Sequence, residues 1–134
     1  MVQVEFYSWH KSPSTQKMER QLLSYMYSLG GVNFQDRAIS DQNLEIALHS
    51  GFVTKRPKLP RQKFAHGAIL CGNEIVVTSG ISDLMLNMGL RPVPIGEQDC
   101  YSYNIFDCKW KQLPDVPIGK LHPTLMVVNS RFVF

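Results

Sequence analysis

The sequence lacks several features that would assign it quickly to a class of protein. It has only three cysteines in 134 residues, an odd number without a C-x2-C pair, which favours free thiols in a reducing compartment over a disulfide framework. Its N-terminal Met-Val-Gln-Val-Glu-Phe is no signal peptide, and no apolar run approaches the roughly 18 residues of a membrane helix. The formal net charge is only +3, so no strong field directs the chain to nucleic acid or to a membrane. These absences favour a soluble, cytoplasmic protein.

Recognisable catalytic and metal-binding motifs are missing as well. The sequence contains no G-x-S-x-G elbow, no G-x-x-x-x-G-K-[ST] loop and no helix-borne metal motif. Asp99 and Asp107 are expected at the solvated edge of a strand. The sequence predicts no catalytic residue and no cofactor. It also predicts no metal ligand, because the available side chains lack zinc-site spacing: Cys71, Cys100, Cys108, His10, His49, His66 and His122.

What the sequence does contain is an internal repeat. When the chain is shifted along itself so that Leu59 falls on Val116, residues 59–64 match residues 116–121 without a gap. Two apolar runs separated by a short polar turn then recur in both copies, at 68–77 and at 125–134. This pattern predicts the same β-hairpin twice.

The same offset holds on the N-terminal side of the prolines. Apolar residues alternate with polar ones in both copies, which predicts a half-buried strand in each. The aligned pairs are Leu44 with Tyr101, Ile46 with Tyr103, Leu48 with Ile105, Val53 with Trp110 and Pro57 with Pro114.

A more distant copy is predicted near the N-terminus. Trp9 and Pro13 repeat the spacing of Trp110 and Pro114, so the first repeat runs from Pro13 to Pro57 and is shorter than the second, from Pro57 to Pro114. Gly30 and Gly31 end an apolar segment, as Ser79 and Gly80 do in the next copy. Residues 1–13 are accordingly assigned to the outer strands of a preceding sheet.

Together these landmarks resemble kelch repeats, whose blades have about 50 residues and four strands each. The family pattern has a double glycine after a hairpin, then a tyrosine, a tryptophan seven positions later, and a proline-bearing turn. Lys63 and Lys120 stand where the family usually has arginine. The resemblance implies an all-β fold, a partial kelch-type β-propeller with about two four-stranded antiparallel blades and partial flanking blades. The residues that carry it are Trp9, Pro13, Gly30, Gly31, Val53, Pro57, Ser79, Gly80, Tyr103, Trp110 and Pro114.

The resemblance also divides the chain. Residues 14–57 are expected to form one blade, and residues 58–114 a second blade with a long loop at 81–99. Residues 115–134 are expected to be the first hairpin of a further, truncated blade. A closed ring needs at least four blades, or about 200 residues. We therefore expect the remaining blades in a longer chain or an associating subunit, because open sheet faces and edges invite association.

Two segments also fit a helix. Met18, Leu22, Met26 and Leu29 lie at helical spacing and end before Gly30. Residues 41–50 have a candidate cap at their first position and a glycine directly after them. The repeat favours a strand in both segments.

The resemblance implies a protein-interaction scaffold, and the missing catalytic motifs predict no enzyme activity. Kelch domains often serve as substrate receptors in ubiquitin ligases or as scaffolds on the cytoskeleton. Two alternatives stay open. One is the propeller portion of a galactose-oxidase-like enzyme, whose metal ligands would lie outside this segment. The other is a nuclear or nucleic-acid-associated protein that uses the basic turn at 55–63.

Strand direction predicts which loops meet a partner. In an up-and-down blade, the turn between blades and the loop between the second and third strands lie on the same face. Residues 54–64 and 81–99 should therefore share a face, and loops on a rigid scaffold commonly carry function. We expect this face to grip an acidic or amphipathic segment of another protein, with no role for a membrane. The predicted partner-binding residues are Arg56, Lys58, Arg61, Leu84, Met85 and Met88. In the alternative interpretation, residues 84–90 fold back as a short helix that only covers the edge of the blade.

Overall fold

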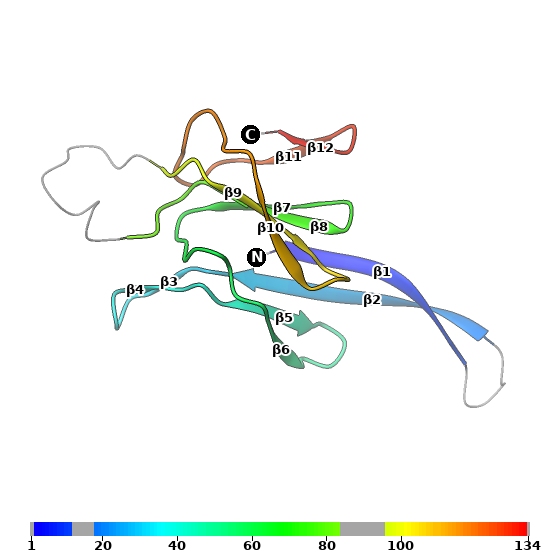
Figure 1. Ribbon diagram of the computed structural model, residues 1–134. Helices are drawn as coiled ribbons and strands as arrows, with labels where there is room; N and C mark the ends of the chain where they lie inside the picture. The colour runs from blue at the N-terminus through cyan, green and yellow to red at the C-terminus, as the bar shows by residue number, and fades with distance from the viewer. Residues whose placement is uncertain (1, 12–17, 84–95, 134) are drawn as a thin grey trace, which may run out of the picture.

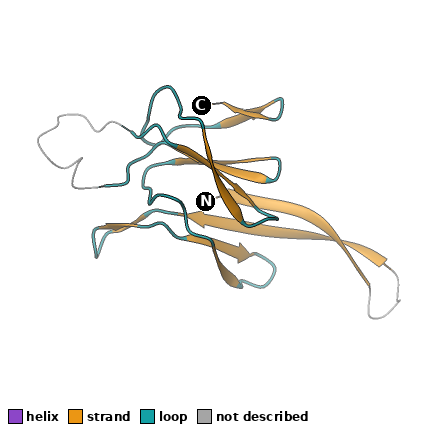
Figure 2. Cartoon of the chain, viewed as in Figure 1, coloured by secondary structure: helices purple, strands orange, loops and turns teal. Residues whose placement is uncertain are grey.

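The computed structural model describes residues 2–11, 18–83 and 96–133, and every regular element in these residues is a β-strand. Figure 2 shows the described chain as strands and loops alone. No helix long and apolar enough to cross a membrane occurs in the described residues. The all-β class predicted from the sequence is thereby confirmed.

The first four-stranded sheet, here called sheet 1, is antiparallel throughout, with the order β1-β2-β5-β6. Its strands are β1 (Val2–Lys11), β2 (Met18–Leu29), β5 (Asn43–Ala47) and β6 (Val53–Arg56). A small hairpin of β3 (Val32–Asn33) and β4 (Ala38–Ile39) separates β2 from β5. In Figure 1 sheet 1 lies lowest and the small hairpin projects to the left.

Both segments that also fit a helix are strands. Residues 18–29 form β2 because this segment pairs with β1 on one side and β5 on the other. Tyr27 lies opposite Val2 in one neighbour and opposite Glu45 in the other. Ladder pairing on both edges satisfies the backbone groups that a helix would have satisfied internally. The predicted strand at residues 41–50 is β5, and it is shorter than the predicted span.

Sheet 2 is a second antiparallel four-stranded sheet, with the order β10-β9-β8-β7. Its strands are β7 (Gly67–Cys71), β8 (Glu74–Thr78), β9 (Cys100–Asn104) and β10 (Lys109–Leu113). Neighbours in sequence are neighbours in the sheet. A final hairpin of β11 (Met126–Val128) and β12 (Arg131–Val133) follows. The two predicted hairpins at 68–77 and 125–134 are therefore present in the described residues.

The assignment of residues 1–13 to a preceding sheet is wrong. Residues 2–11 form β1, which pairs with β2 in sheet 1 along its whole length. Trp9 consequently lies in the first strand of its sheet, whereas Trp110 lies in the last strand of sheet 2. The two tryptophans do not occupy equivalent positions, because strand pairing is decided along the whole strand and a Trp-x3-Pro spacing is short enough to arise by chance. Pro13 lies outside the described residues.

The sheets pack face to face, and the main hydrophobic core lies between them. Val2, Val4, Tyr27 and Leu29 of sheet 1 cluster with Ile75, Val77 and Tyr103 of sheet 2, all of them buried. We call the face of each sheet that points toward the next sheet along the chain its front, and the opposite face its back. The core therefore joins the front of sheet 1 to the back of sheet 2.

A second, smaller core covers the front of sheet 2. It contains Val76, Cys100 and Val116, with Ile69 and Leu113 packed against them. The hairpin β11–β12 lies on this side. Cys71 Sγ in β7 lies 3.4 Å from Ser130 O, in the turn between β11 and β12. Figure 1 shows the resulting order of sheet 1, sheet 2 and the final hairpin from bottom to top.

The sequence repeat is visible in the backbone hydrogen bonds. Leu59 N donates to Asp41 O, and at the same positions of the next copy Val116 N donates to Gln98 O, both at 2.8 Å. The glycines behave alike, since Gly31 N donates to Lys63 O and Gly80 N donates to Lys120 O. The sequence repeat is therefore also a repeat of local structure.

Trp110 and Pro57, both landmarks of the repeat, meet across the two sheets. The indole Nε1 of Trp110 donates a hydrogen bond of 2.9 Å to the carbonyl of Pro57, at the end of β6. The same carbonyl accepts a bond of 3.2 Å from Asn43 Nδ2. The Trp110 ring also packs on Tyr103, with ring centroids 5.1 Å apart. Val53 and Pro114, by contrast, are exposed.

Candidate functional site

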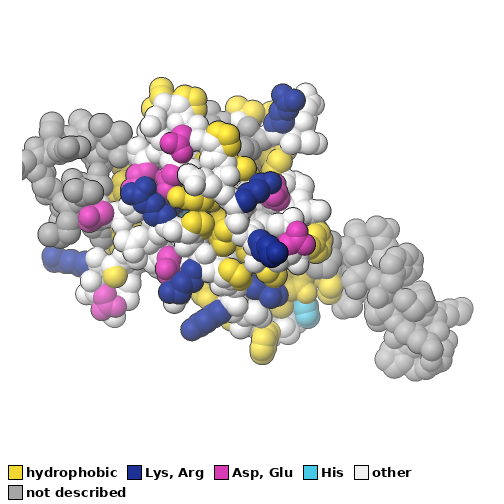
Figure 3. Space-filling view, viewed as in Figure 1, with side chains coloured by type: hydrophobic (Ala, Val, Ile, Leu, Met, Phe, Trp, Pro, Cys, Tyr) yellow, Lys and Arg dark blue, Asp and Glu magenta, His cyan; other side chains and the backbone are white. Residues whose placement is uncertain are grey.

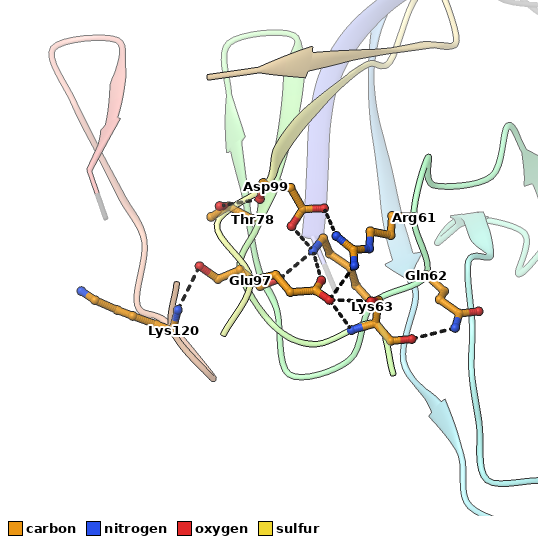
Figure 4. Close-up of polar contacts among 9 residues, drawn as sticks. Arg61, Gln62, Lys63, Thr78, Glu97, Asp99 and Lys120 are labelled. Atoms are coloured by element: carbon orange, nitrogen blue, oxygen red, sulfur yellow. Dashed lines mark hydrogen bonds and ion pairs between the residues drawn. The ribbon is translucent and has the colours of Figure 1, made fainter. Parts of the chain in front are cut away.

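The turn between the two sheets lies against the connection between β8 and β9. Gln62 Nε2 in the turn donates 2.7 Å to Ser82 O in the connection, and Arg61 forms an ion pair with Glu97 near its other end. We call residues 57–66, 79–83 and 96–99 together the loop face (Figure 4). The prediction that these two connections share a face is confirmed for the described residues.

Lys63 is the buried centre of the loop face. Its side chain is 0% exposed, and its ammonium group has three acceptors: Ser79 O at 2.9 Å, Glu97 Oε2 at 3.1 Å and Asp99 Oδ1 at 2.6 Å. An ammonium group has three N–H donors, so these contacts satisfy it completely. A buried charge with full pairing holds its surroundings in one geometry, because removing either partner would leave the other unpaired.

Arg61 covers this cluster from the solvent side. Its guanidinium lies 3.0 Å from Glu97 Oε1 and 3.6 Å from Asp99 Oδ2. Glu97 additionally accepts hydrogen bonds from the backbone and hydroxyl of Ser82. Two cations of the turn thus face two carboxylates at the end of the connection, so the cluster is close to neutral.

Gly80 allows the turn to approach this closely. Its φ is +73°, and a Cβ at this position would lie 2.5 Å from Phe64 O and 2.8 Å from two carbons of His66. Both the backbone angle and the contact favour glycine. The glycine predicted as a repeat landmark is therefore required where the two connections meet.

His66 lies beside this glycine, and its Nδ1 is buried without a hydrogen-bond partner in the described structure. Burial, together with the nearby positive charge of Lys63, lowers the pKa of His66 from 6.5 to about 4. The imidazole is therefore neutral at physiological pH. His66 lies directly before β7.

Of the predicted basic residues, Lys58 and Arg61 belong to this face, whereas Arg56 is the last residue of β6, and each of the three is engaged within the chain. Arg56 forms a two-point pair with Glu45, at 2.9 Å and 3.3 Å. Lys58 lies 3.3 Å from Asp41, and this pair is largely exposed. Figure 3 shows lysines and arginines next to aspartates and glutamates at several places on the viewed face of the molecule. Leu84, Met85 and Met88 lie outside the described residues.

The Arg56–Glu45 pair continues into the core through Tyr27, whose hydroxyl donates to Glu45. Burial and this acceptor together raise the pKa of Tyr27. Burial also raises the pKa of Glu45, but the hydrogen bonds from Arg56 and Tyr27 outweigh it, so the net pKa of Glu45 is lowered. Arg56 is thus a structural residue of sheet 1 as much as a surface cation.

An open depression of about 520 Å³ borders the loop face. It lies between residues 96–99 and 115–119, with Arg61 at its edge. Asp115 and the side chain of Ile118, which is 66% exposed, contribute an acid and an apolar rim. Gln98 Nε2, in the lining of the depression, donates a hydrogen bond of 2.7 Å to Pro117 O on its other side. The depression therefore offers charge of both signs beside apolar surface.

The three cysteines are free, and Cys100 is buried whereas Cys71 and Cys108 are partly exposed. In the part of the chain that the structure describes, no three His, Cys, Asp or Glu side chains are grouped so as to hold a metal ion.

Sequence reasoning missed the acidic half of the loop face. Asp99 was expected at a solvated edge, but it is buried against Lys63, and only Asp107 is exposed as expected. The repeat gave no signal, because Glu97 and Asp99 align with Ser40 and Gln42 in the first copy. Lys63 was recognised as a repeat position, but not as the centre of a charge cluster.

Comparison of the chain with protein-family models found no match. A search of curated proteins likewise found none. The fold therefore assigns the chain to a class, all-β proteins with stacked antiparallel sheets, but the comparisons assign it to no family.

Proposed function

We propose that this chain is part of a kelch-type β-propeller that holds another protein through its loop face. The observation that carries the proposal is the repeated stacking of antiparallel sheets with connections gathered at one end. The shared offset in the backbone hydrogen bonds supports it, because each sheet presents the same turn geometry to the next. Radial stacking of such units is what a propeller requires.

Three features of the loop face support protein binding. Its floor is held rigidly by the buried Lys63 cluster. Its surface carries paired charges of both signs, and the neighbouring depression adds the exposed Ile118. A rigid floor with mixed polar and apolar groups suits an amphipathic protein segment better than a strongly acidic one, because Arg56, Lys58 and Arg61 already have acidic partners.

The same pairing weakens the nucleic-acid alternative, which needs cations available to phosphates. Through the kelch resemblance, the proposal includes a role as a substrate receptor or as a cytoskeletal scaffold. It also includes a cytoplasmic location, which suits free thiols.

Binding through the loop face is tested by comparing two matched double variants of the tagged full chain. Lys58→Glu with Ile118→Asp changes an exposed cation and an exposed apolar side chain at the loop face and depression. Lys111→Glu with Phe106→Asp makes the same two changes outside the loop face and the depression, in β10 and in the turn between β9 and β10. Lys111 pairs with Glu74 at 2.9 Å, and Phe106 is 61% exposed.

We expect quantitative mass spectrometry to find specific partners that the first variant loses and the second retains. Identical partner sets for the wild type and both variants would refute the proposed face. Circular dichroism of both variants establishes that they remain folded.

A further inference from the structure

The repeat relates whole sheet faces, so it identifies which surfaces of the chain are equivalent. Val76 of β8 and Val133 of β12 occupy the same position in the two aligned copies. Pairing places Val76 opposite Ile69, and it places Val133 opposite Met126. Gly30 after β2 and Ser79 after β8 donate equivalent backbone hydrogen bonds, so Tyr27, three residues before Gly30, is the counterpart of Val76, three residues before Ser79. Tyr27 pairs with Val2. Tyr27, Val76 and Val133 thus hold one position in three successive units, and Val2, Ile69 and Met126 hold another.

Equivalent positions differ sharply in exposure. On the front of sheet 1, Val2, Val4 and Tyr27 are 6%, 3% and 3% exposed, because sheet 2 covers them. On the front of the final hairpin, the counterparts Met126, Val128 and Val133 are 54%, 46% and 46% exposed. The hairpin therefore presents the same kind of apolar face without a cover in the described structure.

The back of sheet 1 has the complementary property. Met26, Ile46 and Val53 lie opposite one another across β2, β5 and β6, and they point away from the core formed by Tyr27 and Leu29. Val53 is 50% exposed, and Leu48 on the same face is 45% exposed. In sheet 2 the corresponding back positions, among them Ile75 and Tyr103, are 0% exposed because sheet 1 packs on them.

We infer that a second copy of this chain docks head to tail, with its hairpin front on the back of sheet 1. The inference rests on continuity with an interface that the molecule already contains, since sheet 1 packs its front on the back of sheet 2, and the hairpin lies beside the front of sheet 2 through contacts with β7. The two uncovered surfaces are the remaining front and the remaining back. Such a heterologous contact uses different surfaces on the two copies, so it builds a ring or an open chain of copies.

This contact does not involve the loop face, so it stands or falls independently of the proposed partner binding. It goes beyond that proposal by naming the occupant of the open sheet faces.

The test uses one blocking substitution on each surface. Ile46→Lys blocks the back of sheet 1, and Met126→Lys blocks the hairpin front. Phe34→Lys is the control, because Phe34 is 81% exposed in the turn between β3 and β4 and on neither surface. Analytical ultracentrifugation over about a hundredfold range of concentration measures the mass of each protein and of mixtures.

We expect the wild type and Phe34→Lys to form assemblies that grow with concentration, and each blocked variant alone to be monomeric. An equimolar mixture of the two blocked variants should form a 1:1 dimer that grows no further, because one intact front meets one intact back. A monomeric wild type would overturn the inference. So would blocked variants that still assemble alone, or a mixture that stays monomeric although circular dichroism shows both variants folded.

Discussion

At the residue scale, Lys63 decides the geometry of the loop face. Its ammonium group joins the start of sheet 2 to both ends of the β8–β9 connection through Ser79, Glu97 and Asp99. The sequence indicates a special position here, because the repeat aligns Lys63 with Lys120. The acids that pair with it are separated from it by a long loop, and no local pattern connects them.

Replacing the charge of Lys63 should destabilise the protein strongly. Lys63→Met keeps the length of the side chain but leaves two carboxylates without their buried partner. We expect a loss of about 3 kcal/mol in the free energy of unfolding, measured by urea denaturation. Lys58→Met removes a cation from an exposed pair and should cost less than about 1 kcal/mol. Equal effects of the two substitutions would contradict the structural role of Lys63.

His66 should make stability depend on pH in the acid range. The folded pKa of about 4 lies below the unfolded value of 6.5, so between these two values the unfolded chain binds a proton that the folded chain does not. The stabilising contribution is therefore complete above about pH 6.5 and is lost as the pH falls toward 4, by up to about 3 kcal/mol.

The check is urea denaturation at a series of pH values for the wild type and His66→Gln. The substitution should flatten the curve between pH 6.5 and pH 4. If both proteins lose stability in parallel over this range, the buried neutral imidazole is not the cause.

At the scale of elements, the hairpins and strands that the gapless part of the repeat predicts are present in the described residues, whereas the pairing of β1 with β2 and the small hairpin of β3 and β4 are not among its predictions. The hairpins and the strands around Leu44 and Tyr103 follow from alternation and turn residues, which are local properties. The sheet to which residues 2–11 belong could not be predicted, because it depends on pairing with β2 and not on the Trp9 spacing. The difference between buried Asp99 and exposed Asp107 is likewise set by the Lys63 turn, which lies distant in sequence.

Gly72 and Gly80 have similar backbone angles but different surroundings. Replacing each with alanine therefore separates the stability cost of the backbone angle from the cost of a close contact. Gly72 has a φ of +62° with no atom near a would-be Cβ, whereas Gly80 has a φ of +73° and a backbone oxygen 2.5 Å away. Gly72→Ala should cost about 1 kcal/mol from the backbone angle alone. Gly80→Ala should cost about 3 kcal/mol, because the turn at Phe64 must also shift. Thermal unfolding of both variants measures the difference, and equal costs would show that the two connections are not in contact.

Tyr103 provides the test of the packing between sheets. It is fully buried, and its ring lies 6.2 Å from that of Tyr27 in sheet 1 and 5.1 Å from that of Trp110. Tyr103→Ala should cost about 3–5 kcal/mol, as expected for a large aromatic removed from a core. Phe106→Ala, in the turn after β9, should change stability by less than about 0.5 kcal/mol because Phe106 is exposed. A small loss at Tyr103 would mean that the sheets are not packed as described.

At the scale of the whole molecule, one arrangement explains the repeat, the core and the loop face together. Each sheet buries its front against the back of the next, because a twisted four-stranded sheet is apolar on both faces and cannot cover both alone. The same stacking gathers the connections at one end, where the Lys63 cluster fixes them. The open front and back surfaces at the two ends of the stack follow from the same rule, and they are the basis for the proposed self-association.

Nuclear Overhauser contacts between the methyl groups of the two sheets test this stacking most directly. The front-to-back arrangement predicts contacts from Val2, Val4 and Leu29 to Ile75 and Val77, since all five residues share one buried cluster. Methyl contacts that stay within each sheet, with none between the sheets, would contradict it.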